Sequence, residues 1–183
     1  MKNLLLIFFV FITVLFLSRG FLFRELFSYK SRGERTNYWA TDSKLIELIE
    51  KNIDKETEYE VPEIVQLTLS ITSNHLAFTS GKNHKDPNNL VSSNTAHCVG
   101  YASFFATTCN YLLKKYNLNE NWIAKPQIGQ LYLFNTNIHE YFDASFFKDH
   151  DFVLVTNKES AEVISIDPSI HDYFLIDKVT FIK

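Results

Sequence analysis

The sequence contains few of the residues from which common functional motifs are built. It has two cysteines, five glycines and no glycine-rich phosphate-binding loop. The net charge is only −3 and no long basic run occurs, so the signature of a nucleic-acid-binding protein is missing. No histidine pairs with another at ligand spacing; in HEYFD, Asp143 stands where the zinc motif beginning at His139 needs a second histidine. We therefore expect no metal, no cofactor and no nucleic-acid partner.

Apolar residues are abundant, and one apolar run stands apart from the rest. Hydrophobic residues make up 46% of the 183 residues, enough for one domain with a sizeable core. Residues 4–17, LLLIFFVFITVLFL, would span about 21 Å as a helix. Continued through residues 21–23, the run predicts a single-pass membrane anchor. The alternative is a signal peptide cleaved at Ser18-Arg19-Gly20, and we favour the anchor because no small-residue break precedes that site.

The anchor predicts a membrane-tethered protein, whereas cleavage would make it secreted or periplasmic. Five basic residues follow the apolar run, and the positive-inside rule would keep the C-terminal side in the cytoplasm. These are Arg19, Arg24, Lys30, Arg32 and Arg35. The charge pattern thus opposes simple export, and the orientation stays open.

The chain divides into three parts. Residues 1–23 are a signal anchor or signal peptide, residues 24–40 are charged without a clear period and predict a tether, and residues 41–183 predict one domain. Within the domain, amphipathic spacing predicts helices over 44–53, 62–78 and 98–116, with a loop over 79–94. Strands are expected over 128–134, 150–156, 161–167 and 178–183. Helices followed by antiparallel strands indicate the α+β class.

Cys98 is the first candidate for chemistry. Capping by Thr95 or Asn94 would place it in the first helical turn, where backbone N–H groups and the helix dipole stabilise a thiolate and a developing oxyanion. Gly100, two residues later, indicates a close approach of another backbone. The alternative is that Cys98 is a small buried core residue. Cys109 lies about 16 Å further along the same helix, beyond the reach of a disulfide.

His150 and Asp167 provide the partners that a nucleophilic cysteine needs. His150 opens one predicted strand and Asp167 ends the next. A hairpin with the two-residue turn 158–159 would set the two side chains opposite each other on one face, about 5 Å apart at Cβ. A carboxylate opposite an imidazole fixes its tautomer and supports the imidazolium. The connection over 135–149, rich in aromatic residues, is long enough to cover such a site.

These motifs, taken in order, resemble the transglutaminase-like superfamily. The resemblance rests on AHCVGYAS, DHDFVLV and ISIDPS and spans residues 41–183. It implies a papain-like fold in which N-terminal helices and a nucleophile helix pack on an antiparallel sheet. It also implies a catalytic triad of Cys98, His150 and Asp167. The chain departs from the family pattern at Ala96, where many members have glycine, and at Phe152, where many have tryptophan.

The resemblance implies a thiol enzyme that acts on amide or peptide bonds of a protein or peptide substrate. Cys98 would form an acyl-enzyme, which passes to water in a protease or amidase, or to an amine in a cross-linking enzyme. The sequence leaves these two outcomes open. A catalytically silent binding or scaffold module of the same fold is the alternative. A cell-wall peptidase type with the same Cys–His order would leave IDPS unexplained.

Overall fold

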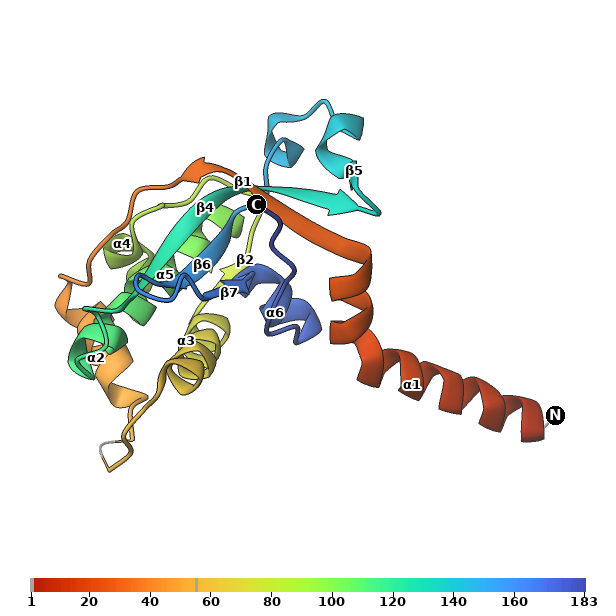
Figure 1. Ribbon diagram of the computed structural model, residues 1–183, viewed down its shortest axis with the longest axis horizontal. Helices are drawn as coiled ribbons and strands as arrows, with labels where there is room; N and C mark the ends of the chain where they lie inside the picture. The colour runs from red at the N-terminus through yellow and green to blue at the C-terminus, as the bar shows by residue number, and fades with distance from the viewer. Residues whose placement is uncertain (1, 55) are drawn as a thin grey trace.

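The computed structural model describes residues 2–54 and 56–183 (Figure 1). Its helices are α1 (Lys2–Leu26), α2 (Ser43–Lys51), α3 (Val61–His75), α4 (Pro87–Ser93), α5 (Cys98–Lys115) and α6 (Pro168–Phe174), with short 3-10 helices η1 (Ile138–Tyr141) and η2 (Ser145–Phe147). Its strands are β1 (Phe27–Glu34), β2 (Ala77–Phe78), β3 (Thr95–Ala96), β4 (Trp122–Leu133), β5 (Thr136–Asn137), β6 (Phe152–Asn157) and β7 (Val163–Ile166). This mixture of helices and an antiparallel sheet confirms the α+β class.

The main sheet is antiparallel, with the strand order β1-β4-β6-β7 and with β5 paired to the end of β4. The predicted strand over 178–183 does not form as a strand. Instead, Phe181 makes an isolated bridge to Tyr29 of β1, and the backbone N–H of Val179 donates to the carbonyl of Ser165 in β7. The C-terminal segment therefore contacts both edge strands of the sheet.

The predicted tether over 24–40 is wrong for most of its length. Residues 24–26 complete α1, and residues 27–34 form β1, which pairs with β4 from Phe27↔Leu133 to Glu34↔Gln127. The charged side chains of this segment obscure the strand pattern because only Ser28 and Tyr29 are buried in it. The folded domain consequently begins directly after α1.

The β6–β7 hairpin forms, but its predicted register is wrong by two residues. The structure pairs Val153 with Ile166 and Thr156 with Val163, and the connection is four residues long, over 158–161. Asp167 is therefore not directly opposite His150. Because a shift of two residues keeps every side chain on its original face, the predicted face of the hairpin survives the error.

Helix α5 lies at the centre of the core, where it packs on β4 and β6 and against α3 and α4. Its N-cap is His97, whose Nδ1 accepts a hydrogen bond from the backbone N–H of Val99 at 3.3 Å. The predicted caps have other roles. Asn94 ends α4 in a left-handed conformation, and Thr95 pairs with Ala77 in the small β2–β3 sheet.

The predicted loop over 79–94 also needs correction, because residues 87–93 form α4. Asp86 caps this helix by accepting from the backbone N–H of Asn88, and Pro87 occupies its first position. Leu90 and Val91 then face the core. The Asp-Pro pair is a helix-start signal as well as a loop signal, and burial decided between them.

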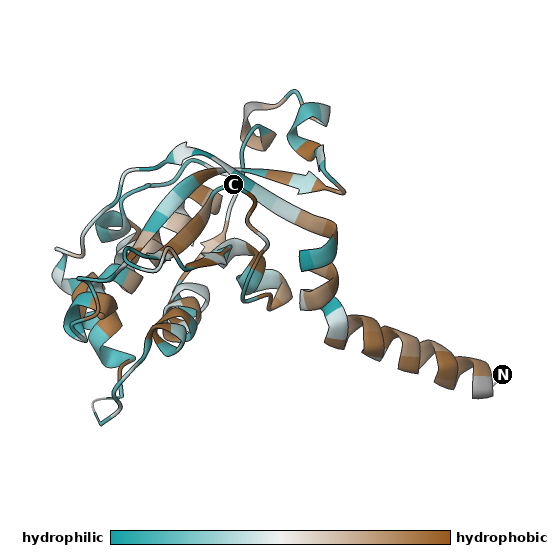
Figure 2. Cartoon of the chain, viewed as in Figure 1, coloured by the Kyte–Doolittle hydropathy of each residue, from teal (hydrophilic) through white to brown (hydrophobic). Residues whose placement is uncertain are grey.

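Helix α1 projects away from the rest of the molecule, with the N-terminus at its far end (Figure 1). Figure 2 shows it as an almost continuously apolar helix up to the residues near the domain. Residues Leu4–Leu26 are long and apolar enough to span a membrane or to act as a signal sequence, and none of the most apolar window is buried within the protein.

Candidate active site

Asp167 is the most tightly held residue of the predicted triad. It follows β7 and caps α6: its Oδ1 accepts from the hydroxyl and backbone N–H of Ser169 and from the backbone N–H of Ile170. Its Oδ2 accepts from Tyr29 Oη at 2.7 Å and is 2.6 Å from His150 Nε2. The carboxylate is fully buried, so each of these hydrogen bonds fixes it without competition from water.

The pairing of His150 with Asp167 shifts both pKa values. Burial alone would raise the pKa of Asp167, but the His150 charge and the hydrogen bonds to His150, Ser169 and Tyr29 lower it below its usual value. Burial would lower the pKa of His150, but the Asp167 carboxylate raises it. The two groups therefore favour a carboxylate and an imidazolium. Because Asp167 holds Nε2, Nδ1 is the ring nitrogen left to exchange a proton with another group.

Cys98 is the first residue of α5 and is 8% exposed. Burial raises the pKa of its thiol to about 11; a hydrogen bond from the backbone of Asp151 opposes this rise, and the carboxylates of Asp151, Asp167 and Asp149 add to it. Cys98 is thus a thiol at neutral pH unless a base takes its proton. Cys109, by contrast, is fully buried in the core, where Thr68 hydrogen bonds to it, and burial raises its pKa to about 12.

Cys98 and His150 line one cavity of about 270 Å³. The remaining lining is mainly apolar and consists of Phe78, Leu131, Ile138, His139, Phe142, Phe146, Phe147 and Asp149. Six of these residues come from the connection 135–149, so this segment forms much of the wall of the cavity beside Cys98 and His150, as its length and aromatic content had led us to expect. Asp167 lies behind His150, outside the lining, in the position of an orienting group rather than a reacting one.

His139 fastens the covering segment to the sheet. Its Nε2 accepts from the backbone N–H of Leu131 in β4 at 3.0 Å, and its Nδ1 donates to the carbonyl of Phe147 at 2.6 Å. Both ring nitrogens are used, and the side chain is only 7% exposed. His139 therefore has a structural role in shaping the cavity. No group of three or more His, Cys, Asp or Glu side chains within residues 2–54 and 56–183 is arranged to hold a metal ion.

Arg35 balances the acidic residues on either side of His150. Its guanidinium donates to both carboxylate oxygens of Asp151, at 2.8 and 3.0 Å, and to Asp149 at 2.9 Å. Burial raises the pKa of Asp151, whereas Arg35 lowers it. By neutralising these carboxylates, Arg35, the residue directly after β1, limits the negative field at Cys98.

Two glycines allow the close packing that brings these elements together. A Cβ on Gly129 would collide with the carbonyl oxygen of His150 and would lie 2.6 Å from the ring of Phe152. A Cβ on Gly100 would lie 2.7 Å from the Cβ of Ala96. The predicted close approach of another backbone at Gly100 is wrong: the close neighbours are side chains, and the nearest backbone atom, the carbonyl oxygen of His84, would be at an ordinary 3.6 Å from this Cβ. Gly100 leaves the space that Ala96 occupies.

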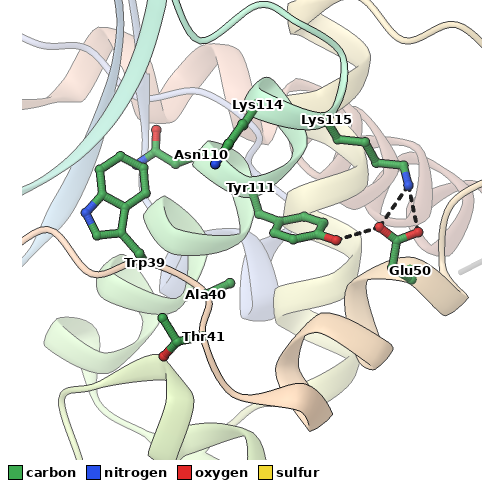
Figure 3. A pocket seen from close by; sticks show the side chains of 8 residues that line it. All are labelled: Trp39, Ala40, Thr41, Glu50, Asn110, Tyr111, Lys114 and Lys115. Atoms are coloured by element: carbon green, nitrogen blue, oxygen red, sulfur yellow. Dashed lines mark hydrogen bonds and ion pairs between the residues drawn. The ribbon is translucent and has the colours of Figure 1, made fainter.

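A larger cavity of about 540 Å³ lies near the other end of α5 (Figure 3). Tyr111 and Lys115 both hydrogen bond to Glu50 there, across α5 and α2. Its lining contains no cysteine or histidine; it comprises Trp39, Ala40, Thr41, Glu50, Asn110, Tyr111, Lys114 and Lys115. The cavity lined by Cys98 and His150 is therefore the better candidate for acyl transfer.

Three residues that shape the site escaped the sequence analysis: Tyr29, Arg35 and His139. Tyr29 and Arg35 belong to the segment interpreted as a tether, and His139 was considered only as a metal ligand. An alternating pattern around Tyr29 was the one available signal, and the flanking charges hide it. Comparison of the chain with protein-family models, curated proteins and solved structures gives no match. The assignment of a function therefore depends on the geometry of the site.

Proposed function

We propose that the chain is a membrane-tethered thiol enzyme that acts on amide bonds through Cys98, His150 and Asp167. The observation that carries the proposal is the shared cavity: a cysteine at a helix N-terminus and a histidine line it together, and a buried carboxylate holds the far nitrogen of that histidine. This is the order of roles in a thiol triad. The resemblance of the surrounding motifs to the transglutaminase-like superfamily, with its papain-like fold, supports the same proposal.

In the proposed reaction, Cys98 Sγ attacks the carbonyl carbon while its proton passes to Nδ1 of His150. The N-terminus of α5 supplies backbone N–H groups and the positive end of its dipole to the oxyanion. The imidazolium then protonates the leaving amine as the C–N bond breaks. Water or a second amine releases the acyl group from the sulfur. Asp167 keeps His150 oriented throughout and does not itself change its protonation.

The protonation states set a pH requirement for this reaction. With a thiol pKa of about 11 and a raised imidazole pKa, the pair must lose one proton before Cys98 can react. That loss belongs to the Cys98–His150 pair as a unit. Reactivity should therefore rise with pH through the apparent pKa of the pair, and Asp167→Asn should move that pKa downward because it removes the charge that favours the imidazolium.

Alkylation of Cys98 by iodoacetamide between pH 5 and 10, followed by peptide mass spectrometry, tests the proposal. At pH 7.5 an isolated thiol with a pKa of 11 has about 300-fold less thiolate than a free cysteine. In His150→Ala we expect Cys98 to be alkylated as slowly as this thiolate fraction implies. The wild type should be alkylated about two orders of magnitude faster than His150→Ala. Cys109 provides the internal control, since it is buried in both proteins.

Equal labelling rates in the wild type and in His150→Ala would contradict the proposal. That outcome would favour the other candidate, a catalytically silent binding module whose apolar cavity holds a ligand. Near-complete burial of Cys98 in the present conformation is the observation that favours this second candidate. Circular dichroism of both proteins excludes unfolding as the cause of any difference.

A further inference from the structure

If Cys98 acts as in the function proposed above, the composition of the cavity beside it points to a substrate class. Its aromatic and aliphatic walls come from β2, from β4 and from the covering segment 138–147. The polar groups in the lining, apart from the reacting pair, are already engaged. His139 uses both ring nitrogens, and Asp149 pairs with Arg35 at 2.9 Å. An incoming polar side chain would be desolvated there without these groups as free partners.

The size of the cavity fits one large side chain. A dry protein cavity of about 150 Å³ is enough to bind benzene. At about 270 Å³, the space beside Cys98 accommodates an aromatic ring or a branched aliphatic side chain, but not a second bulky group. Phe142, Phe146 and Phe147 are each between 38 and 46% exposed, so an occupant would also cover apolar surface that now faces solvent.

The charges around the cavity disfavour an acidic substrate side chain. Asp149, Asp151 and Asp167 all act on Cys98 with the same sign. Arg35 offsets the first two, but its guanidinium is bound to them and is not part of the lining. An acidic side chain next to the reacting carbonyl would thus meet both an apolar wall and a negative field.

We propose that this cavity is the acyl-side specificity pocket, and that it receives an aromatic or branched aliphatic side chain adjoining the amide bond that Cys98 attacks. Continuity with the reacting residues identifies the occupant, because Cys98 and His150 are themselves part of the pocket wall. The substrate is then a peptide or acyl-amide with a bulky apolar residue on the carbonyl side of the cleaved bond.

N-acetyl aminoacyl chloromethyl ketones with Phe, Leu, Gly or Asp side chains test this specificity on the full-length protein in detergent. In the reaction a Sγ–CH₂ bond forms, the C–Cl bond breaks, chloride leaves and the thiol proton passes to His150. Mass spectrometry gives the rate of Cys98 modification. Burial of one large apolar side chain predicts that the Phe and Leu reagents react about tenfold to a hundredfold faster than the Gly reagent, with Asp slowest.

Substitutions at two neighbouring residues, Phe142 and Tyr141, test whether the cavity wall causes the preference for apolar side chains. Phe142→Ala should lower the Phe-to-Gly rate ratio severalfold, because Phe142 forms part of the wall. Tyr141→Ala is the matched control, since Tyr141 is 75% exposed and lies outside the lining. Phe142→Lys should raise the rate with the Asp reagent relative to Gly. Both Phe142 variants replace a side chain that is 43% exposed, so the fold should tolerate them.

The outcomes separate this inference from the function on which it rests. Equal rates with all four reagents, or a wild-type preference that Phe142→Ala leaves unchanged, would overturn the specificity pocket while leaving a reactive triad. Rates that His150→Ala does not alter for any reagent would instead overturn the proposed function.

Discussion

At the scale of single residues, hydrogen bonds from several elements meet at the Asp167 carboxylate. Five hydrogen bonds from the described residues converge on it, three through its role as a helix cap and two from Tyr29 and His150. A buried charge with this many donors stays ionised and immobile. The same residue therefore follows β7, caps α6 and holds the imidazole of His150.

The pKa shifts of the pair predict how stability depends on pH. The pKa of Asp167 is lowered in the folded protein, so its contribution is present above about pH 4 and is lost as pH falls through the folded value. The pKa of His150 is raised, so its contribution is complete below about pH 6.5 and is lost as pH rises through the folded value. The ion pair consequently stabilises the fold most between about pH 4 and pH 6.5.

Asp167→Asn should remove this contribution. Urea unfolding is expected to show a loss of about 3 to 5 kcal/mol near pH 5, because the partly buried imidazolium of His150 is left without its buried partner, and a smaller loss at pH 9. Asp177→Asn is the control: it breaks a second His–Asp pair, with His171 at 3.0 Å, whose carboxylate side is 47% exposed. We expect at most about 1 kcal/mol there. A loss for Asp167→Asn that is the same at pH 5 and pH 9 would contradict the ion pair.

At the scale of elements, the position of His150 just before β6 is set by its close approach to β4, the antiparallel neighbour of β6. The backbone N–H of His150 donates to the carbonyl of Gly129 at 2.9 Å, and Phe152 packs over the same glycine. This close approach holds His150 next to β4, where it lines the cavity with Cys98 and pairs with Asp167. The absent side chain at Gly129 is thus a condition for the position of the imidazole.

Gly129→Ala should displace His150 and weaken the candidate site. The added Cβ has backbone and a fully buried ring as neighbours, so overpacking is expected to lower the free energy of unfolding by about 1 to 3 kcal/mol. The rate at which Cys98 is alkylated at pH 7.5 should fall toward that of His150→Ala. Gly81→Ala serves as the control, since its nearest neighbour is the exposed hydroxyl of Thr79 at 3.3 Å. Wild-type stability and labelling in Gly129→Ala would show that the close approach at Gly129 does not determine the position of His150.

At the scale of the whole molecule, the apolar helix and the domain are joined without a linker. Helix α1 ends at Leu26 and β1 begins at Phe27. Arg19 also donates from Nε to the carbonyl of Phe174 at 2.6 Å and from Nη2 to that of Leu175 at 3.2 Å, at the C-terminal end of α6. The domain is thereby attached to α1 just beyond the apolar run.

This attachment predicts an uncleaved anchor. The full-length protein should remain in the membrane pellet after alkaline extraction, and its intact mass should include the first residues. Phe9→Arg with Phe11→Arg should release it, because each arginine at mid-membrane costs about 2.5 to 3.5 kcal/mol, while Phe9→Leu with Phe11→Leu should keep it bound. A mature chain that begins at Phe21 would identify a signal peptide instead, and would also remove Arg19 from α6.

Much of the fold followed from local sequence patterns. The helical period around Cys98 predicted α5, and alternation predicted β6 and β7 nearly to their ends. His150 and Asp167 were expected on one face, and they form a hydrogen bond despite a register error of two residues. The prediction survived because side-chain direction repeats every two residues along a strand, so parity rather than exact alignment placed the pair on that face.

By itself, the sequence determined the class of the fold, the helix that begins with Cys98 and the common face of His150 and Asp167, since short-range periodicity encodes all three. Only the tertiary structure decided that Tyr29, 138 residues away, donates a hydrogen bond to the buried carboxylate of Asp167. It also decided that Arg35 neutralises the acidic residues beside His150, and that the segment 138–147 forms an apolar pocket over Cys98. The physical reason is that these contacts form when segments far apart in the sequence pack together, and short-range periodicity does not specify which distant segments will be neighbours.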